Sequence, residues 1–91
     1  MSSEPVHLSN HHRTTLAKVF QHPVSHNLEW HDALSLMSAV AKVEEKHDGK
    51  YEITLGEVTQ SFERPKHKDL AAQEVLDIRR MLSDAGFEPP K

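Results

Sequence analysis

The stretch VEEKHDGKYEITLGEVTQSFE, residues 43–63, decides the fold because its apolar residues recur at every second position. A short, charged first strand is expected over 43–47. Asp48 and Gly49 follow as a pair typical of a tight β-hairpin turn, and Gly56 breaks the chain again before a third strand. The pattern predicts an antiparallel meander with one face toward solvent. The residues expected to face inward are Tyr51, Ile53, Leu55, Val58 and Phe62.

Helical periodicity appears on both sides of this stretch. One helix is expected over about 11–22, with Asn10 as its cap and Pro23 as its stop. Two more are expected over about 28–41 and 71–85. Their inward apolar positions are Leu16, Val19 and Phe20 in the first helix, Trp30, Ala33, Leu34, Met37, Val40 and Ala41 in the second, and Val75, Ile78, Leu82 and Ala85 in the third.

These elements predict an α+β fold in which a small antiparallel three-stranded sheet packs against helices in the order α-α-β-β-β-α. Residues 1–9 are expected to form a flexible N-terminal arm, 10–88 a single domain, and 89–91 a tail. Gly86 suits the left-handed position that ends a helix, and Phe87 is placed for the apolar contact that accompanies it.

Composition excludes several classes of protein. The chain has 91 residues, which suits one domain, and it has no cysteine, so it has neither disulfides nor thiolate zinc ligands. No apolar run reaches the ~18 residues of a membrane helix, and the N-terminus lacks the apolar core of a signal peptide. We therefore expect a cytoplasmic protein that does not associate with membranes. The formal charge of −3 does not indicate strong nonspecific binding of nucleic acid.

Cationic side chains gather after the third predicted strand. Such side chains bind the phosphates of RNA. The alternative is a solvated loop, because residues 42–68 as a whole hold equal numbers of basic and acidic residues. The candidate RNA-binding residues are Lys50, Arg64, Lys66, His67 and Lys68.

Histidine is abundant, with eight residues in the chain. His22, His26 and His31 lie within ten residues of one another, and His11 and His12 are one helix away. Converging imidazoles bind zinc or copper. However, a proline separates the first two, which removes helical spacing, and no HExxH motif is present. The pattern favours capping and surface imidazoles, with no metal site and no cofactor.

The segment RPKHKDL, residues 64–70, precedes a helix that ends in Ala-Gly-Phe at 85–87. Together with the helix and three strands before it, this segment resembles the HicA family of toxins from bacterial toxin–antitoxin systems. The resemblance covers about residues 30–88, so the N-terminal helix and its His-Pro connector lie outside the family pattern. It implies a HicA-like domain with a double-stranded-RNA-binding-like fold, mRNA cleavage that blocks translation, and neutralisation by a HicB partner.

The resemblance also indicates where catalysis would reside. The family depends on a histidine in a Gly-Ser-His segment at the start of the second strand, and here the segment reads Asp48-Gly49-Lys50. His47, three residues before Lys50, is the second candidate. Cleavage through the 2′-hydroxyl needs a proton acceptor, and a protonated lysine is not one. The sequence thus predicts a divergent or inactive mRNA interferase that associates with RNA.

A protein-interaction module on the same fold is the alternative. A polar, mixed-charge sheet face suits a HicB-like antitoxin or another protein partner at least as well as RNA, although solvated sheet faces look the same. The residues of that face are Lys50, Glu52, Thr59, Ser61 and Glu63.

Overall fold

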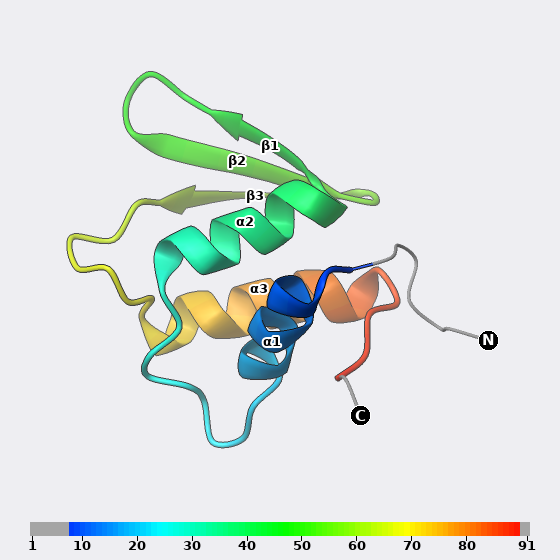
Figure 1. Cartoon of the computed structure of the whole chain (residues 1–91). Coiled ribbons are helices and arrows are strands. Elements are labelled where there is room, and N and C mark those ends of the chain that lie inside the picture. The colour runs from blue at the N-terminus through cyan, green and yellow to red at the C-terminus, as the bar shows by residue number, and fades with distance from the viewer. Residues whose placement is uncertain (1–7, 90–91) are drawn as a thin grey trace.

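The computed structural model describes residues 8–89 and places all three helices on one side of a three-stranded sheet (Figure 1). The α+β class and the order α-α-β-β-β-α predicted from the sequence are confirmed. The elements are α1 (Asn10–Val19), α2 (Trp30–Val40), β1 (Lys42–Glu45), β2 (Lys50–Leu55), β3 (Val58–Glu63) and α3 (Ala72–Asp84).

The sheet has the strand order β1-β2-β3, and both pairings are antiparallel. Tyr51 pairs with Phe62, and both side chains are buried. The next pair along the ladder, Lys50 and Glu63, is exposed. Because successive side chains of a strand point to opposite faces, the helices cover one face, here called the inner face, and leave the outer face open.

Two glycines adopt the left-handed backbone conformation that their sequence positions predict. Gly49 has a φ of 83° in the β1–β2 turn, and Gly86 has a φ of 97° after α3. The backbone N–H of Phe87 donates to the carbonyl of Leu82 at 3.0 Å, and the Phe87 ring is buried. The predicted end of the last helix is therefore confirmed as a Schellman-type cap.

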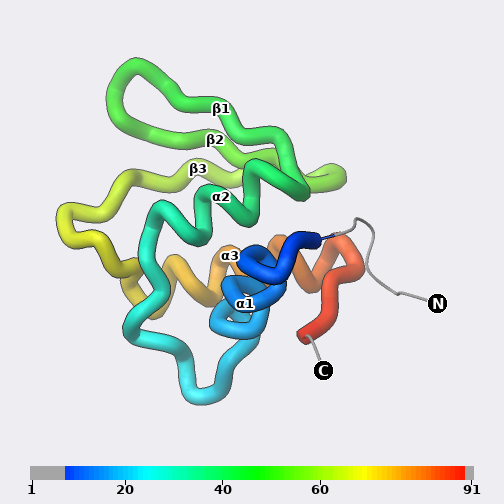
Figure 2. The backbone as a smooth tube through the Cα atoms, in the orientation of Figure 1, coloured from blue at the N-terminus to red at the C-terminus, as the bar shows by residue number. Residues whose placement is uncertain are grey.

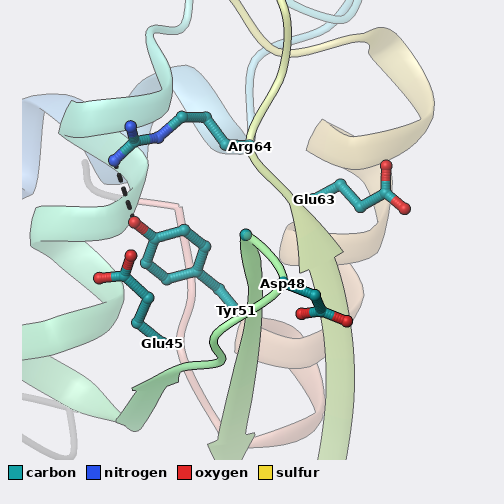
Figure 3. A pocket seen from close by; sticks show the side chains of 6 residues that line it. Glu45, Asp48, Tyr51, Glu63 and Arg64 are labelled. Carbon is teal, nitrogen blue, oxygen red and sulfur yellow. Dashed lines mark hydrogen bonds between the residues drawn. The ribbon is translucent and has the colours of Figure 1, made fainter.

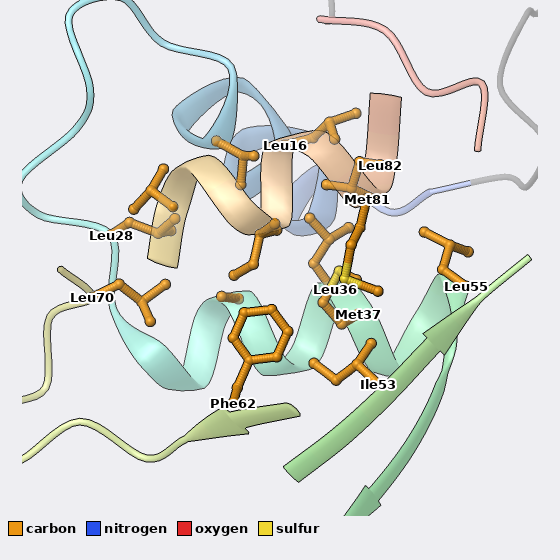
Figure 4. Packing of buried hydrophobic residues seen from close by; sticks show 14 of the residues in the cluster. Leu16, Leu28, Leu36, Met37, Ile53, Leu55, Phe62, Leu70, Met81 and Leu82 are labelled. Carbon is orange, nitrogen blue, oxygen red and sulfur yellow. The ribbon is translucent and has the colours of Figure 1, made fainter. Parts of the chain in front are cut away.

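The core lies between the inner face of the sheet and the helices (Figure 4). Ile53 and Phe62 of the sheet point toward Leu36 and Met37 of α2. Each fully buried aliphatic side chain stabilises the fold by about 1.5–3 kcal/mol relative to an exposed one. The largest fully buried hydrophobic residues are Leu16, Leu28, Leu36, Met37, Ile53, Ile78, Met81, Leu82, Val19 and Val75.

Helix α1 begins and ends earlier than its sequence pattern predicts. Ser9, not Asn10, is the cap residue, because the Ser9 hydroxyl accepts a hydrogen bond from the backbone N–H of His12 at 3.2 Å. The helix ends at Val19, so the predicted span 11–22 is wrong at its C-terminal end.

A tertiary contact accompanies the early end of α1. The guanidinium of Arg79, on α3, donates to the carbonyl of Val19 at 2.9 Å and to that of Gln21 at 2.8 Å. The last carbonyls of a helix have no partner within it, so a side chain from another element satisfies them here. This contact joins residues nearly sixty positions apart and gives no signal in the local sequence.

Three further predictions need correction. In α2 the predicted inward residue Leu34 is only partly buried, whereas Leu36, which was not in the predicted set, is fully buried. The reason is that both the sheet and α1 cover this helix. Val58, predicted to face inward, is 38% exposed, since it begins β3 at the edge of the covered area. The first strand occupies Lys42–Glu45 instead of 43–47, and α2 and α3 are each shorter than predicted by one or two residues per end.

The two ends of the chain are described only in part. Residues 1–7 of the predicted arm and residues 90 and 91 of the predicted tail lie outside the described residues. Leu8 is 2% exposed in the core, and Ser9 caps α1. These two residues belong to the folded domain and not to an arm.

Candidate nucleic-acid interface

Residues 64–69, here called the basic loop, are fixed to the start of α2 by backbone hydrogen bonds. The N–H of Trp30 donates to the carbonyl of Lys68 at 2.7 Å, and the N–H of Leu70 donates to the carbonyl of Leu28 at 2.9 Å. Figure 2 shows the two segments meeting at one end of the molecule. Leu28 and Leu70 are both buried, so the loop is anchored by packing as well as by hydrogen bonds.

A cavity of about 250 Å³ lies between the basic loop and the start of α2. Four of the five predicted RNA-binding residues line it, together with a histidine that the sequence did not place there. Among the residues that the structure describes, none of those lining this cavity carries a carboxylate. The lining residues are Trp30, His31, Arg64, Pro65, Lys66, His67 and Lys68.

Aromatic side chains support the guanidinium of the loop. Nη2 of Arg64 donates to the hydroxyl of Tyr51 at 3.0 Å, and its guanidinium carbon lies 5.9 Å from the centre of that ring (Figure 3). Tyr51 in turn packs edge-on against Trp30, with ring centroids 5.3 Å apart. Sequence reasoning treated both rings as core only. The one signal in the sequence was the hydroxyl of Tyr51, since the hydroxyl of a buried tyrosine usually has a hydrogen-bond partner.

The indole N–H of Trp30 is buried and lacks a hydrogen-bond acceptor among residues 8–89. An unsatisfied buried donor costs about 1–3 kcal/mol, so native proteins usually supply a partner for it. Here a water molecule or a ligand oxygen would have to do so. Trp30, which lines the cavity of the basic loop (here called the cationic cavity), therefore retains an unused donor.

A second cavity, of about 380 Å³, lies beside the β1–β2 hairpin and has the opposite character (Figure 3). Its lining includes three carboxylates and a single guanidinium, which makes it unfavourable for phosphate. Arg64 lines both cavities and so stands between an acidic and a basic region. The lining residues are Glu45, Asp48, Gly49, Tyr51, Glu63 and Arg64.

The two predicted catalytic candidates lie apart from the cationic cavity. Lys50 begins β2, next to the buried Tyr51, so its side chain belongs to the outer face of the sheet. His47 is exposed between β1 and the turn. Neither residue lines either of the two cavities described above.

The outer face of the sheet carries paired charges. Nζ of Lys46 lies 3.6 Å from a carboxylate oxygen of Glu44 and 4.0 Å from one of Glu52. The hydroxyls of Thr54 and Thr59 lie 3.0 Å apart, within hydrogen-bonding distance. Exposed ion pairs contribute only about 0–1 kcal/mol, so this face is a balanced polar surface and not a strongly stabilising one.

Comparisons with family models, curated proteins and solved structures find no match to this chain. Among the described residues, no helix has the length and apolar character needed to cross a membrane.

Proposed function

We propose that this chain is an RNA-binding protein of the HicA type whose basic loop contacts the phosphate backbone and whose ribonuclease activity is lost or strongly reduced. The convergence of Arg64, Lys66, His67 and Lys68 on one cavity carries the proposal, because its lining within residues 8–89 includes no carboxylate. The order α2-β1-β2-β3-α3 supports it, since the resemblance to the HicA family implies that order.

The loss of nuclease activity follows from the residue at the expected catalytic position. Lys50 is exposed on the outer face of the sheet, and the ammonium group of a lysine has no lone pair with which to take a proton from a 2′-hydroxyl. Lys50 is still able to contact a phosphate as a point charge. His47 is a poor substitute because it lies beyond the turn, away from the cationic cavity.

Salt-dependent RNA binding tests the first half of the proposal. The anisotropy of a labelled, unstructured RNA oligonucleotide is measured at several salt concentrations with the wild type and with the triple variant Arg64→Ala, Lys66→Ala, Lys68→Ala. The matched control, Lys42→Ala, Lys46→Ala, Arg80→Ala, removes the same charge from exposed positions outside the basic loop. Each lost phosphate contact lowers the slope of log affinity against log salt by about 0.7. We expect that fall only in the basic-loop variant.

Two outcomes would reject RNA binding through the loop. One is a wild type that does not bind the oligonucleotide at low salt. The other is an equal loss in both triple variants, since that would indicate general charge attraction and no defined site. Circular dichroism of both variants ensures that an unfolded protein is not mistaken for a nonbinding one.

Restoring the histidine tests the second half. The wild type should leave the RNA intact, whereas Lys50→His should cleave it slowly if the rest of the family site has survived. Lys50→Ala serves as the control. Cleavage by the wild type that Lys50→Ala abolishes would make this chain an enzyme and would overturn the proposed loss of activity.

A protein-interaction module is the second candidate function. The helices leave the outer face of the sheet open (Figure 1). Its charges alternate in sign, as in Glu44 and Lys46. The direct probe is the purified product of any HicB-like gene adjacent to the one that encodes this chain, with complex formation measured by size-exclusion chromatography. Binding that Glu52→Lys weakens favours this candidate, and absence of a complex counts against it.

A further inference from the structure

The charges that line the cationic cavity are not neutralised by the protein. Among the residues that the structure describes, no carboxylate forms an ion pair with Arg64, Lys66 or Lys68. Arg64 donates to the hydroxyl of Tyr51 at 3.0 Å, and a guanidinium has further N–H donors beyond that bond. The positive charge on this cavity therefore exceeds what one internal phosphate of RNA, with its single negative charge, would balance.

A buried donor belongs to the wall of the same cavity. Trp30 is 6% exposed and lines the cavity. Its indole N–H is the only buried side-chain nitrogen or oxygen without a hydrogen-bond partner among residues 8–89. A ligand oxygen that accepts this hydrogen bond removes the cost of leaving a buried donor unsatisfied. Trp30 therefore indicates a ligand that brings acceptor oxygens to the cationic cavity.

The start of α2 adds a backbone donor at this end of the molecule. The N–H of Trp30 is used by the carbonyl of Lys68, but Glu29, at the cap position, makes no side-chain cap bond. In the part of the chain that the structure describes, the backbone N–H of His31, which lines the cavity, has no acceptor. Free N–H groups at a helix N-terminus favour an anion, and phosphate is the common one. This helix end thus supports the same class of ligand as the cations and the indole.

Two carboxylates lie near the start of α2, where they would oppose an anion. Oε1 of Glu29 lies 2.9 Å from Nε2 of His31, and Oδ1 of Asp32 lies 3.3 Å from Nε2 of His11. Neither carboxylate belongs to the lining of the cavity. Both are therefore held by imidazoles, and the described lining has only cationic or uncharged side chains.

The size of the cavity and the excess of positive charge favour the end of an RNA strand over its interior. A volume of about 250 Å³ is below the range of about 300–1,000 Å³ that is typical of small-molecule sites, so the cavity suits a phosphate group and not a whole nucleotide. A terminal phosphate monoester carries a charge of about −1.5 to −2 at pH 7 and offers three acceptor oxygens. It is attached to the strand on one side only, whereas an internal phosphate continues into a sugar on both sides. A terminal phosphate can therefore enter a cavity and balance more of its charge.

We propose that the cationic cavity binds the terminal phosphate monoester of an RNA strand. Arg64, Lys66 and Lys68 balance its charge, and the indole N–H of Trp30 donates to one of its oxygens. This inference rests on the proposed RNA binding by the basic loop and names the part of the RNA that the loop recognises. Both the 5′ and the 3′ end of a strand can carry such a phosphate, so the test includes both.

The test measures the anisotropy of one internally labelled RNA oligonucleotide in three forms, with a 5′-phosphate, with a 3′-phosphate and with hydroxyls at both ends. The full chain is used in phosphate-free buffer at one salt concentration. We expect at least one phosphorylated form to bind about fivefold tighter or more than the hydroxyl form, because it adds charge-assisted hydrogen bonds. Lys66→Ala with Lys68→Ala should reduce this preference below about twofold, and the matched pair Lys42→Ala with Lys46→Ala should preserve it. Trp30→Phe keeps an aromatic ring without the N–H and should reduce the preference about two- to threefold.

The failure of this inference can be distinguished from the failure of RNA binding itself. Equal affinity for the three forms would overturn recognition of a terminal phosphate and leave RNA binding by the loop in place. Absence of binding to every form would reject both. A preference that survives in the basic-loop pair, or that falls equally in both lysine pairs, would overturn the assignment to the cavity. Circular dichroism identifies any variant that has lost its fold, and the two lysine pairs keep the test decisive if Trp30→Phe is such a variant.

Discussion

The basic loop and the outer face of the sheet carry the same number of lysines and arginines but arrange them differently. On the sheet, carboxylates alternate with the cations, and Lys46 lies within 4.0 Å of two of them. On the loop, Arg64, Lys66 and Lys68 line one cavity, and the other described residues in its lining add no carboxylate. The net charge of a segment therefore does not reveal how its charges are arranged. What matters is whether the fold interleaves opposite charges or separates them.

The largest expected effect, on both stability and RNA affinity, comes from removing the packing that anchors the basic loop. Leu70 is 4% exposed, and its N–H donates to Leu28 at the entry to α2. Leu70→Ala should destabilise the protein by about 2–5 kcal/mol, measured by chemical denaturation, because it leaves a cavity in the core. It should also lower RNA affinity under conditions where the protein remains folded. Unchanged affinity in the folded variant would mean that the anchored shape of the loop is unimportant.

Charge reversal tests the comparison directly. Lys66→Glu with Lys68→Glu should lower RNA affinity at least about tenfold, equivalent to about 1.4 kcal/mol. The matched pair Lys42→Glu with Lys46→Glu should lower it less than about threefold, since it acts on an already mixed surface. Anisotropy at one fixed salt concentration provides both values. If the sheet pair has the larger effect, RNA binding belongs on the outer face.

A smaller effect is expected from the ring beneath Arg64. Tyr51→Phe keeps the buried ring and removes the hydroxyl that accepts from Nη2 of Arg64 at 3.0 Å. Stability should fall by about 1 kcal/mol, because one net hydrogen bond is lost. RNA affinity should fall about two- to threefold, because the guanidinium is no longer oriented. An affinity equal to that of the wild type would show that Tyr51 does not position the guanidinium.

The smallest effect is expected on the outer face. Thr54→Val breaks the hydroxyl contact with Thr59, yet valine suits a strand and the site is only partly buried. Stability should change by no more than about 0.5 kcal/mol in urea denaturation, and RNA binding should be unaffected. A loss above about 2 kcal/mol would indicate that this face is covered in solution, which would favour the protein-interaction candidate.

Local signals in the sequence predicted local structure well. The Asp48-Gly49 turn, the alternation around Ile53 and the Gly86-Phe87 helix end depend on backbone preferences of neighbouring residues, and the structure confirms them. The end of α1 was missed because a side chain from α3 satisfies its carbonyls.

The residues of the candidate sites also differ in how far the sequence predicted them, depending on whether they are close together along the chain. The cations of the basic loop lie within five residues of one another, so the sequence already indicated that they gather in one place. The contribution of His31 to that cavity was missed, as was the meeting of His11 with Asp32, since each pair of segments joins only in the folded chain. No spacing rule connects residues on different helices.

The contact made by Arg79 bears on what the minimal folding unit of this protein is. The part that we propose to be of the HicA type, about residues 30–88, does not include α1. A chain trimmed to that part would leave the Arg79 guanidinium without its two carbonyl acceptors and would uncover the apolar surface on which Leu16 and Val19 are now fully buried. We expect the trimmed protein to aggregate or to melt at a much lower temperature than the full chain, so α1 is an integral part of the fold and not an appendage.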